Sequence, residues 1–301
     1  MTSEITTQDG YYIGPWRAPE NEGRGTTGNI HADEDARRLG FRGGLVAGSI
    51  HMEQLAPLLV RAFGERWLER GSISLYFLTP TLHGEEVRAL IGVPGGVPPA
   101  GANNAQVEAW MERRDGTRIC EGTAAIGTPD EPSALHARQL DKHVATELRI
   151  LAQARAGDEF PVVDTRVEEE ALDKRLAVIT EPMSWYRDAS LWGGRVPTTV
   201  NQVNALMEPA YAYLRKRQAP AIGLYGAIEL RNVHGPMLAP TTYRSGGTLL
   251  HVGETPKTEY AWFDTWADDS DRRVVEMRMM LRFMKASSPV YRGAGAAAQT
   301  P

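Results

Sequence analysis

A short sequence frame that occurs twice, 150 residues apart, constrains this chain more than any other feature. Residues 37–49 read RRLGFRGGLVAGS and residues 187–199 read RDASLWGGRVPTT, so each copy holds Gly-Gly-x-Val followed by small residues. One such match can arise by chance, but each copy is followed by the same succession of patterns, first helical and then strand-like. A repeat at half the length of a 301-residue chain predicts two similar structural units.

Each frame opens a helical pattern. Apolar residues recur at three- and four-residue spacing after both frames, which predicts long helices near 48–63 and 198–216. Ser49 and Thr198 are the expected N-caps, because their hydroxyl oxygens can accept from free amides of the first turn. An internal proline in each helix is expected to bend or break it.

After each helix the apolar pattern changes to period two, which is typical of strands with one buried face. Asp115-Gly116 is a strong hairpin signal between two of these strands. Residues 128–160 are polar and are expected to form a linker that contains a helix near Leu135–Ala156. The expected strands are Ser72–Leu78, Glu85–Val93, Ala105–Arg113 and Arg118–Gly127 in the first half, and Ala221–Asn232, Tyr243–Val252, Thr258–Ala267 and Arg273–Met284 in the second.

One helix followed by an antiparallel meander requires the helix to lie across the sheet, because the sheet must cover one face. This is the α+β layout of a double hot-dog, with two antiparallel sheets each wrapped around one long helix. We expect an N-terminal domain over residues 1–148, a C-terminal domain over 149–290, and a flexible tail over 291–301. Pairing of the two units edge to edge would hide their edge strands.

Composition and charge exclude several function classes. The net charge of −5 and the pI of about 5.9 argue against a nucleic-acid scaffold, which would carry a basic stripe. The single cysteine, Cys120, excludes an internal disulfide framework and a multi-cysteine zinc site. No signal peptide and no apolar run of about 20 residues is visible. We therefore expect a cytoplasmic protein without cofactor, metal, membrane span or nucleic-acid partner.

The segment GTTGNIHADEDARRLGFRGGLVAGSIH at residues 25–51 resembles the MaoC-like family of hot-dog acyl-thioester hydratases and dehydratases. The likeness is specific over roughly residues 25–90 and extends loosely over the rest of the chain. It implies an acyl group bound to coenzyme A or to a carrier as the substrate. The residues that carry it are Asn29, Ile30, His31, Asp33, the stretch Ala36–Gly40, Gly43-Gly44-Leu45-Val46 and Gly48.

In that family an aspartate and a histidine handle the water and the substrate's α-proton, and a glycine amide holds the thioester oxygen. The resemblance implies that His31 is the general acid or base, since a histidine titrates near neutral pH. It implies that the Gly48 amide, at a helix N-terminus, is the oxyanion donor. Asn29 and Ser49 are the further candidates for substrate binding.

The chain departs from the family at the aspartate, five positions before the histidine, where it has Thr26. A threonine can hydrogen-bond a water but cannot take its proton at neutral pH. Asp33, in the same loop, is one candidate for the missing carboxylate, so Thr26 and Asp33 stand beside His31 as candidate catalytic residues. By the 150-residue offset, Glu181 is the position in the second half that is equivalent to His31. Glu181 or Asp188 is the candidate for the carboxylate from the second half.

The leading hypothesis is a hydro-lyase of enoyl-CoA hydratase or 3-hydroxyacyl dehydratase type, acting in fatty acid metabolism. A non-catalytic acyl-thioester-binding protein is the alternative that the missing aspartate would allow. A thioesterase is the other alternative, because the same fold and helix amide serve hydrolysis. The sequence leaves open whether two such chains form a homodimer.

Overall fold

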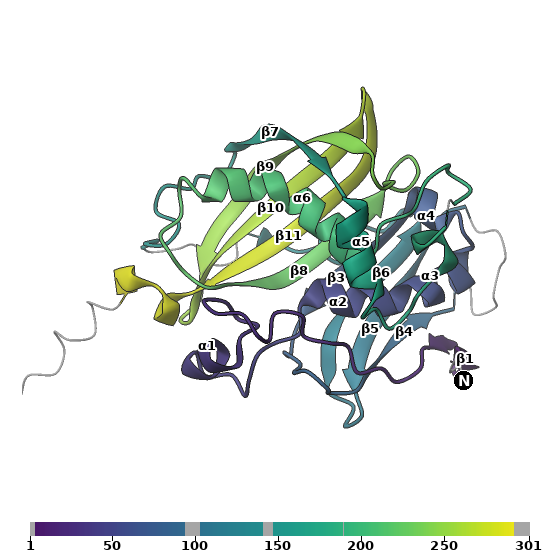
Figure 1. Ribbon diagram of the computed structural model, residues 1–301, viewed down its shortest axis with the longest axis horizontal. Helices are drawn as coiled ribbons and strands as arrows, with labels where there is room; N and C mark the ends of the chain where they lie inside the picture. The colour runs from purple at the N-terminus through teal and green to yellow at the C-terminus, as the bar shows by residue number, and fades with distance from the viewer. Residues whose placement is uncertain (1–3, 94–102, 141–146, 189, 292–301) are drawn as a thin grey trace, which may run out of the picture.

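A single antiparallel sheet runs through both halves of the chain (Figure 1). The computed structural model describes residues 4–93, 103–140, 147–188 and 190–291. The strand order is β1-β2-β4-β5-β6-β3-β8-β11-β10-β9-β7. The strands of the first half are β1 (Thr6–Gln8), β2 (Tyr11–Ile13), β3 (Gly71–Phe77), β4 (Val87–Gly92), β5 (Ala105–Arg113) and β6 (Arg118–Ile126). Those of the second half are β7 (Glu159–Arg166), β8 (Gly223–Asn232), β9 (Thr242–Glu254), β10 (Thr258–Asp269) and β11 (Arg272–Met284).

The two halves meet where β3 pairs with β8. Ser72–Tyr76 pair antiparallel with Ala227–Arg231, so each strand covers the other's edge. The predicted edge-to-edge pairing of the two units is therefore present. The two predicted antiparallel sheets are present as the halves of one continuous sheet, because the backbone hydrogen bonds of β3 and β8 join them.

The long helix of the second half is α6 (Thr199–Leu214), which packs against β7, β9, β10 and β11 (Figure 1). Its predicted N-cap is confirmed, since the Thr198 side chain accepts from the Asn201 amide at 3.4 Å. Pro209 lies inside this helix.

The matching element of the first half is broken into α2 (Gly48–Met52), the 3₁₀ turn η1 (Glu53–Leu55) and α3 (Ala56–Phe63). The break precedes Pro57, which lies in the first turn of α3, where its missing N–H costs nothing. The N-cap is Ala47, so the prediction of Ser49 as N-cap is wrong: Ser49 is the second residue of α2 and is buried. The remaining helices are α1 (Asp33–Arg38), α4 (Trp67–Arg70), α5 (Glu169–Leu176) and the 3₁₀ turns η4 (Ser184–Tyr186), η5 (Lys285–Ser287) and η6 (Pro289–Tyr291).

The segment between the halves differs from its prediction. Over its described residues the expected helix near Leu135–Ala156 is wrong, because no α-helix forms there. Leu135 is instead fully buried in a small apolar cluster with Ala227, Trp262 and Met280 of the sheet. The end of the supposed linker starts strand β7, an edge strand that pairs with β9.

A buried ion pair ties the helices of the two halves together. Arg175 of α5 donates to the Glu53 carboxylate of η1 at 2.6 and 2.9 Å, and only 3% and 1% of these side chains are exposed. Glu22 adds a second carboxylate, 2.9 Å from the Arg175 guanidinium. Glu53 also accepts from the Val200 amide in the first turn of α6, at 3.4 Å. Charges removed so fully from water persist only when paired.

We predict that Glu53→Gln lowers the free energy of unfolding by about 3 kcal/mol or more, because it leaves the buried Arg175 guanidinium without its main counter-charge. Urea unfolding of the purified chain measures this loss. The matched control is Glu170→Gln, whose partner Lys174 is exposed, and it should leave the free energy of unfolding nearly unchanged. Equal losses in both variants would contradict this account of Glu53.

Candidate functional site

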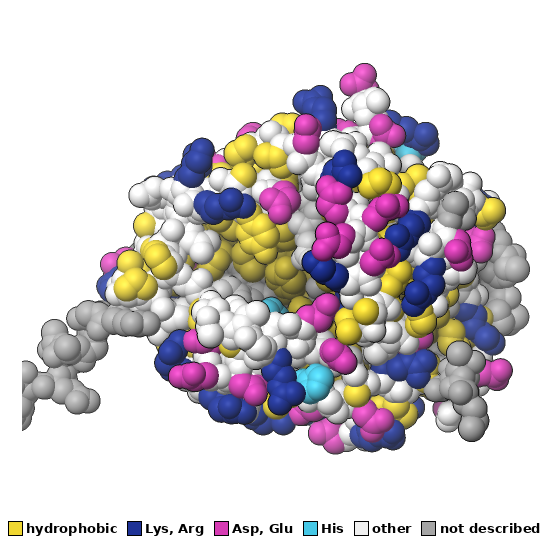
Figure 2. Space-filling view, in the orientation of Figure 1, with side chains coloured by type: hydrophobic (Ala, Val, Ile, Leu, Met, Phe, Trp, Pro, Cys, Tyr) yellow, Lys and Arg dark blue, Asp and Glu magenta, His cyan; other side chains and the backbone are white. Residues whose placement is uncertain are grey.

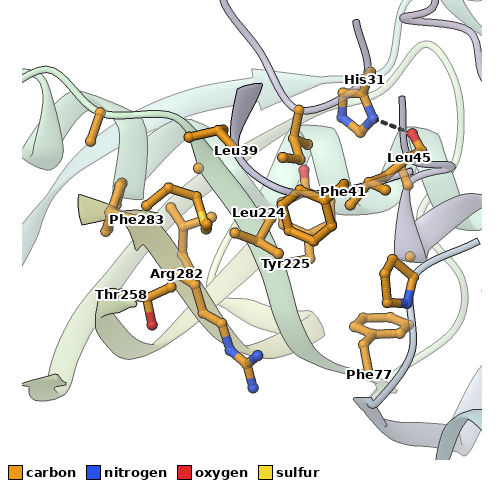
Figure 3. Close-up of a pocket in the computed structure, with 18 of the residues that line it drawn as sticks. His31, Leu39, Phe41, Leu45, Phe77, Leu224, Tyr225, Thr258, Arg282 and Phe283 are labelled. Atoms are coloured by element: carbon orange, nitrogen blue, oxygen red, sulfur yellow. Dashed lines mark hydrogen bonds between the residues drawn. The ribbon is translucent and has the colours of Figure 1, made fainter. Parts of the chain in front are cut away.

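A cavity of about 960 Å³ lies between the halves, where β3 and β8 stop pairing. Its lining combines the loop before α2 with the ends of β3, β8 and β11, and Figure 2 shows the hollow with hydrophobic side chains on its walls. The close-up in Figure 3 shows His31 at one side of this space and Arg282 at another. The large apolar side chains on the lining include Leu39, Phe41, Leu45, Phe77, Leu224, Tyr225, Leu281 and Phe283.

His31 is held in this lining by tight backbone packing. A Cβ on Gly44 would lie 2.0 Å from the His31 carbonyl oxygen, and one on Gly23 would lie 2.5 Å from the His31 Cβ. Glycine at both positions lets two neighbouring chain segments close on His31. The Asn21 amide donates to the His31 carbonyl at 2.8 Å, and the Asn29 side chain accepts from the His31 amide at 2.9 Å. These contacts fix the backbone that carries the imidazole.

The tautomer of His31 follows from one hydrogen bond. Its Nδ1 lies 2.7 Å from the Leu45 carbonyl oxygen, drawn as the dashed line in Figure 3. A carbonyl oxygen only accepts, so Nδ1 carries the proton and Nε2 keeps its lone pair in the neutral ring. His31 lines the cavity, and Nε2 is the nitrogen equipped to take a proton from a ligand there.

Gly48, the first residue of α2, also lines the cavity. In the described part of the chain its amide makes no hydrogen bond to another residue. A Cβ on Gly48 would lie 2.3 Å from the Phe77 ring, so only glycine allows that ring to pack here. The amide is therefore an unpaired donor at the N-terminal end of a helical segment, as an oxyanion donor requires.

His51, one turn further along α2, lines the same cavity and was not predicted as a site residue. It is buried, and its Nε2 contacts the Thr81 hydroxyl. Its Nδ1 is buried without a partner in the described structure. Burial lowers the pKa of His51 from 6.5 to about 4, so its ring stays neutral at pH 7. No sequence motif pointed to His51, because only the folded chain brings this residue to the cavity.

The loop residues Thr26 and Asn29 do not line the cavity. The exposed Thr26 hydroxyl donates to the Gly23 carbonyl at 2.5 Å and accepts from the Asn29 side-chain amide at 2.6 Å. Asn29 thus supports the loop that carries His31, and the structure shows no contact between Thr26 and His31. Ser49 is buried in α2 and is also absent from the lining.

Asp33 is engaged by the backbone of its own loop. Its carboxylate accepts from the Gly44 amide at 2.8 Å, and Arg37 and Arg24 lie at 3.6 and 3.9 Å. The Gly44 amide, helped by these guanidinium groups, holds the pKa of Asp33 below its usual range. Asp33 therefore closes the loop around Gly44 and does not line the cavity.

The second-half candidates also lie elsewhere. Glu181 pairs with Arg17 at 2.5 Å, although burial raises the pKa of its carboxyl group. Asp188 lies in a separate small groove with Trp185 and Trp192. Among the described residues no carboxylate bonds to His31, and none of those that line the cavity is Asp or Glu.

The charged residues on the lining are three cations, Arg215, Lys257 and Arg282. Over the described ranges no group of three or more His, Cys, Asp and Glu side chains is placed to hold a metal ion. The helices within those ranges include none that is both long and apolar enough to span a membrane.

Comparison with known proteins identifies the fold. No family model matches the sequence, and no curated protein matches it. A conserved hypothetical protein of Mycobacterium tuberculosis, described as having a double hotdog fold, superimposes with a TM-score of 0.61 at 11% identity, over 90% of this chain and 96% of its own. This chain is a double hot-dog protein.

Two other solved structures share the double hot-dog arrangement of this chain. A protein of Chloroflexus aurantiacus named as a MaoC domain dehydratase matches with a TM-score of 0.59 at 9% identity, over 91% of this chain and 94% of its own. A MaoC-like dehydratase matches with a TM-score of 0.55 at 15% identity, over 91% and 97%. These likenesses of fold agree with the resemblance of residues 25–90 to MaoC-like proteins.

We predict that His51 makes the fold sensitive to acid. The folded pKa lies below the unfolded one, so protons bind the unfolded chain more tightly, and stability falls as pH drops from about 6.5 towards 4. From pH 7.5 to 4.5, protonation of this histidine in the unfolded chain should lower the free energy of unfolding by about 2 kcal/mol. Urea unfolding at both pH values should show that His51→Gln loses this part of the pH dependence. The exposed His234→Gln should keep the wild-type profile, and an unchanged profile in His51→Gln would refute the assignment.

Proposed function

We propose that this protein binds an acyl thioester in the cavity between its halves and adds or removes water across the acyl chain. The observation that supports this proposal is the presence of the His31 imidazole and the unpaired Gly48 amide on one largely apolar lining. The apolar walls suit an acyl chain, and the two polar groups suit the reacting end of it.

In the dehydration direction, His31 Nε2 takes the α-proton of a 3-hydroxyacyl thioester. The electron pair of that C–H bond forms the α,β double bond as the bond from the β-carbon to its hydroxyl breaks. The Gly48 amide stabilises the negative charge that develops on the thioester oxygen. The departing hydroxide takes the proton from His31 and leaves as water. Hydration is the reverse of these steps.

A single histidine serves both as base and as acid in this scheme. The proton removed from the α-carbon is the one that the leaving hydroxide needs, so the atoms balance without a carboxylate. This mechanism requires the α-hydrogen and the β-hydroxyl to lie on the face of the substrate that meets His31. The Leu45 carbonyl supports it, because it stabilises the protonated ring through Nδ1.

A non-catalytic acyl-thioester-binding protein is the second candidate. It is favoured by the lining, which among the described residues has no carboxylate to orient a water beside His31. Such a protein would hold the same ligand in the same cavity and leave it unchanged.

We predict that the wild-type chain consumes the double bond of an enoyl-CoA, and that His31→Ala reduces kcat/KM by about 100-fold or more. Loss of enoyl absorbance measures turnover, and calorimetry measures binding of a saturated acyl-CoA, which should survive the substitution. His234→Ala, which replaces an exposed histidine, is the matched control and should keep full turnover.

The other outcomes separate the alternatives. Binding without turnover in the wild type would establish the second candidate. Release of free thiol from a saturated acyl-CoA would indicate a thioesterase. Full activity in His31→Ala would show that this histidine is not the acid–base group.

A further inference from the structure

We propose that the cavity selects an acyl group that carries a carboxylate in addition to its thioester, and that Arg282 binds this carboxylate. This inference rests on the proposed binding of an acyl thioester, and it names the class of acyl group. The observations that carry it are the fixed position of Arg282, its lack of a counter-ion and its place on the cavity lining.

The Arg282 side chain is held across the junction of the two halves. It extends from β11 over Gly226 of β8, where a Cβ would lie 2.7 Å from the Arg282 Nε. Its guanidinium then donates to the Tyr76 hydroxyl of β3 at 2.7 Å. The guanidinium carbon lies 5.4 Å from the centre of the Tyr76 ring. A long side chain anchored in this way loses little further freedom when it binds a ligand.

The anchored guanidinium has no carboxylate partner. Within the described residues, no Asp or Glu oxygen lies within 4.0 Å of Arg282. Arg278, four residues earlier on the same strand, shows the contrast, since it binds both oxygens of Asp264 at 2.8 Å. Arg282 is half-buried and lines a cavity beside Leu224, Phe283 and other apolar groups. A cation in such surroundings is poorly solvated and gains from an anion supplied by a ligand.

The geometry favours a carboxylate on the acyl group over a phosphate of the carrier. One planar guanidinium with a free edge matches one planar carboxylate through two parallel hydrogen bonds. Arg215 and Lys257, the other cations of the lining, are exposed and are better placed for a hydrated phosphate. Figure 3 shows the Arg282 guanidinium directed away from His31. With the thioester at His31, the proposed carboxylate therefore lies at the far end of the acyl group.

The test uses N-acetylcysteamine thioesters, which carry no phosphate. One series consists of monothioesters of straight-chain dicarboxylic acids of increasing length, and the matched series consists of their methyl esters, which lack the charge. Calorimetry should show that the wild type binds the acid of best-fitting length about tenfold or more tightly than its methyl ester. Arg282→Leu should abolish this preference while binding of the methyl ester is kept.

Further variants keep the test informative. Tyr76→Phe removes only the anchoring hydroxyl and should weaken the preference, which provides a second readout if Arg282→Leu fails to fold. Arg282→Lys should retain part of it, because the charge stays and the planar fork is lost. Arg272→Leu, an exposed change of equal charge on the same strand, should leave the preference intact.

Two results would overturn the proposal. Equal affinity of the wild type for acid and methyl ester at every length would remove the carboxylate preference. Loss of affinity for coenzyme A itself in Arg282→Leu, with the preference unchanged, would assign Arg282 to a phosphate. Failure of the wild type to bind any thioester of either series or any acyl-CoA would instead contradict the proposed function.

Discussion

The antiparallel pairing of β3 with β8 is the interaction on which the rest of this structure depends. It joins two units with similar sequence frames into one sheet, and it ends at Tyr76 and Ala227. Beyond that point the cavity is lined by Phe77 of β3, by residues 78–80 that follow it, and by residues 223–225 of β8. The same hydrogen bonds that hide two sheet edges therefore also decide where the halves separate and where a ligand can enter.

The two halves use their helix N-termini differently. At the start of α2, Gly48 lines the cavity and its amide is unpaired in the described structure. At the start of α6, Thr198 caps the helix and the Glu53 carboxylate accepts from the Val200 amide. One half thus keeps an open donor, and the other pairs two of its donors, one with the Thr198 side chain and one with a carboxylate of the first half.

Much of the fold could be predicted because period-two patterns record which face of each strand is buried. The predicted strand Ala105–Arg113 has the bounds of β5, and the others lie within a few residues. Strand β7 could not be predicted, because it is an edge strand that contains Pro161 and a break in register. Most of its residues are not buried, so it lacks the period-two pattern. In the segment near Leu135, where a helix is expected, the Leu135 side chain packs instead in a small cluster on the sheet. Local patterns do not encode that contact.

The candidate site could be predicted only where one segment holds it. His31 and Gly48 lie in one loop-and-helix segment, and the structure brings both to the cavity. The expectation that Asp33 acts as the carboxylate partner has no support in its contacts, because the Gly44 amide engages it. His51 and Arg282 gain their places through Thr81 and Tyr76, which are distant in sequence, so no spacing could reveal them.

The hydrogen bond from His31 to the Leu45 carbonyl has a consequence for how this site can change. The tautomer of the imidazole is set by a backbone oxygen, so no neighbouring side chain is needed to keep the lone pair on Nε2. In a histidine oriented by a carboxylate, replacing that carboxylate would alter the base itself. Here the residues around the cavity can be exchanged to reshape the space for a different acyl group, and the proton-accepting nitrogen keeps its orientation.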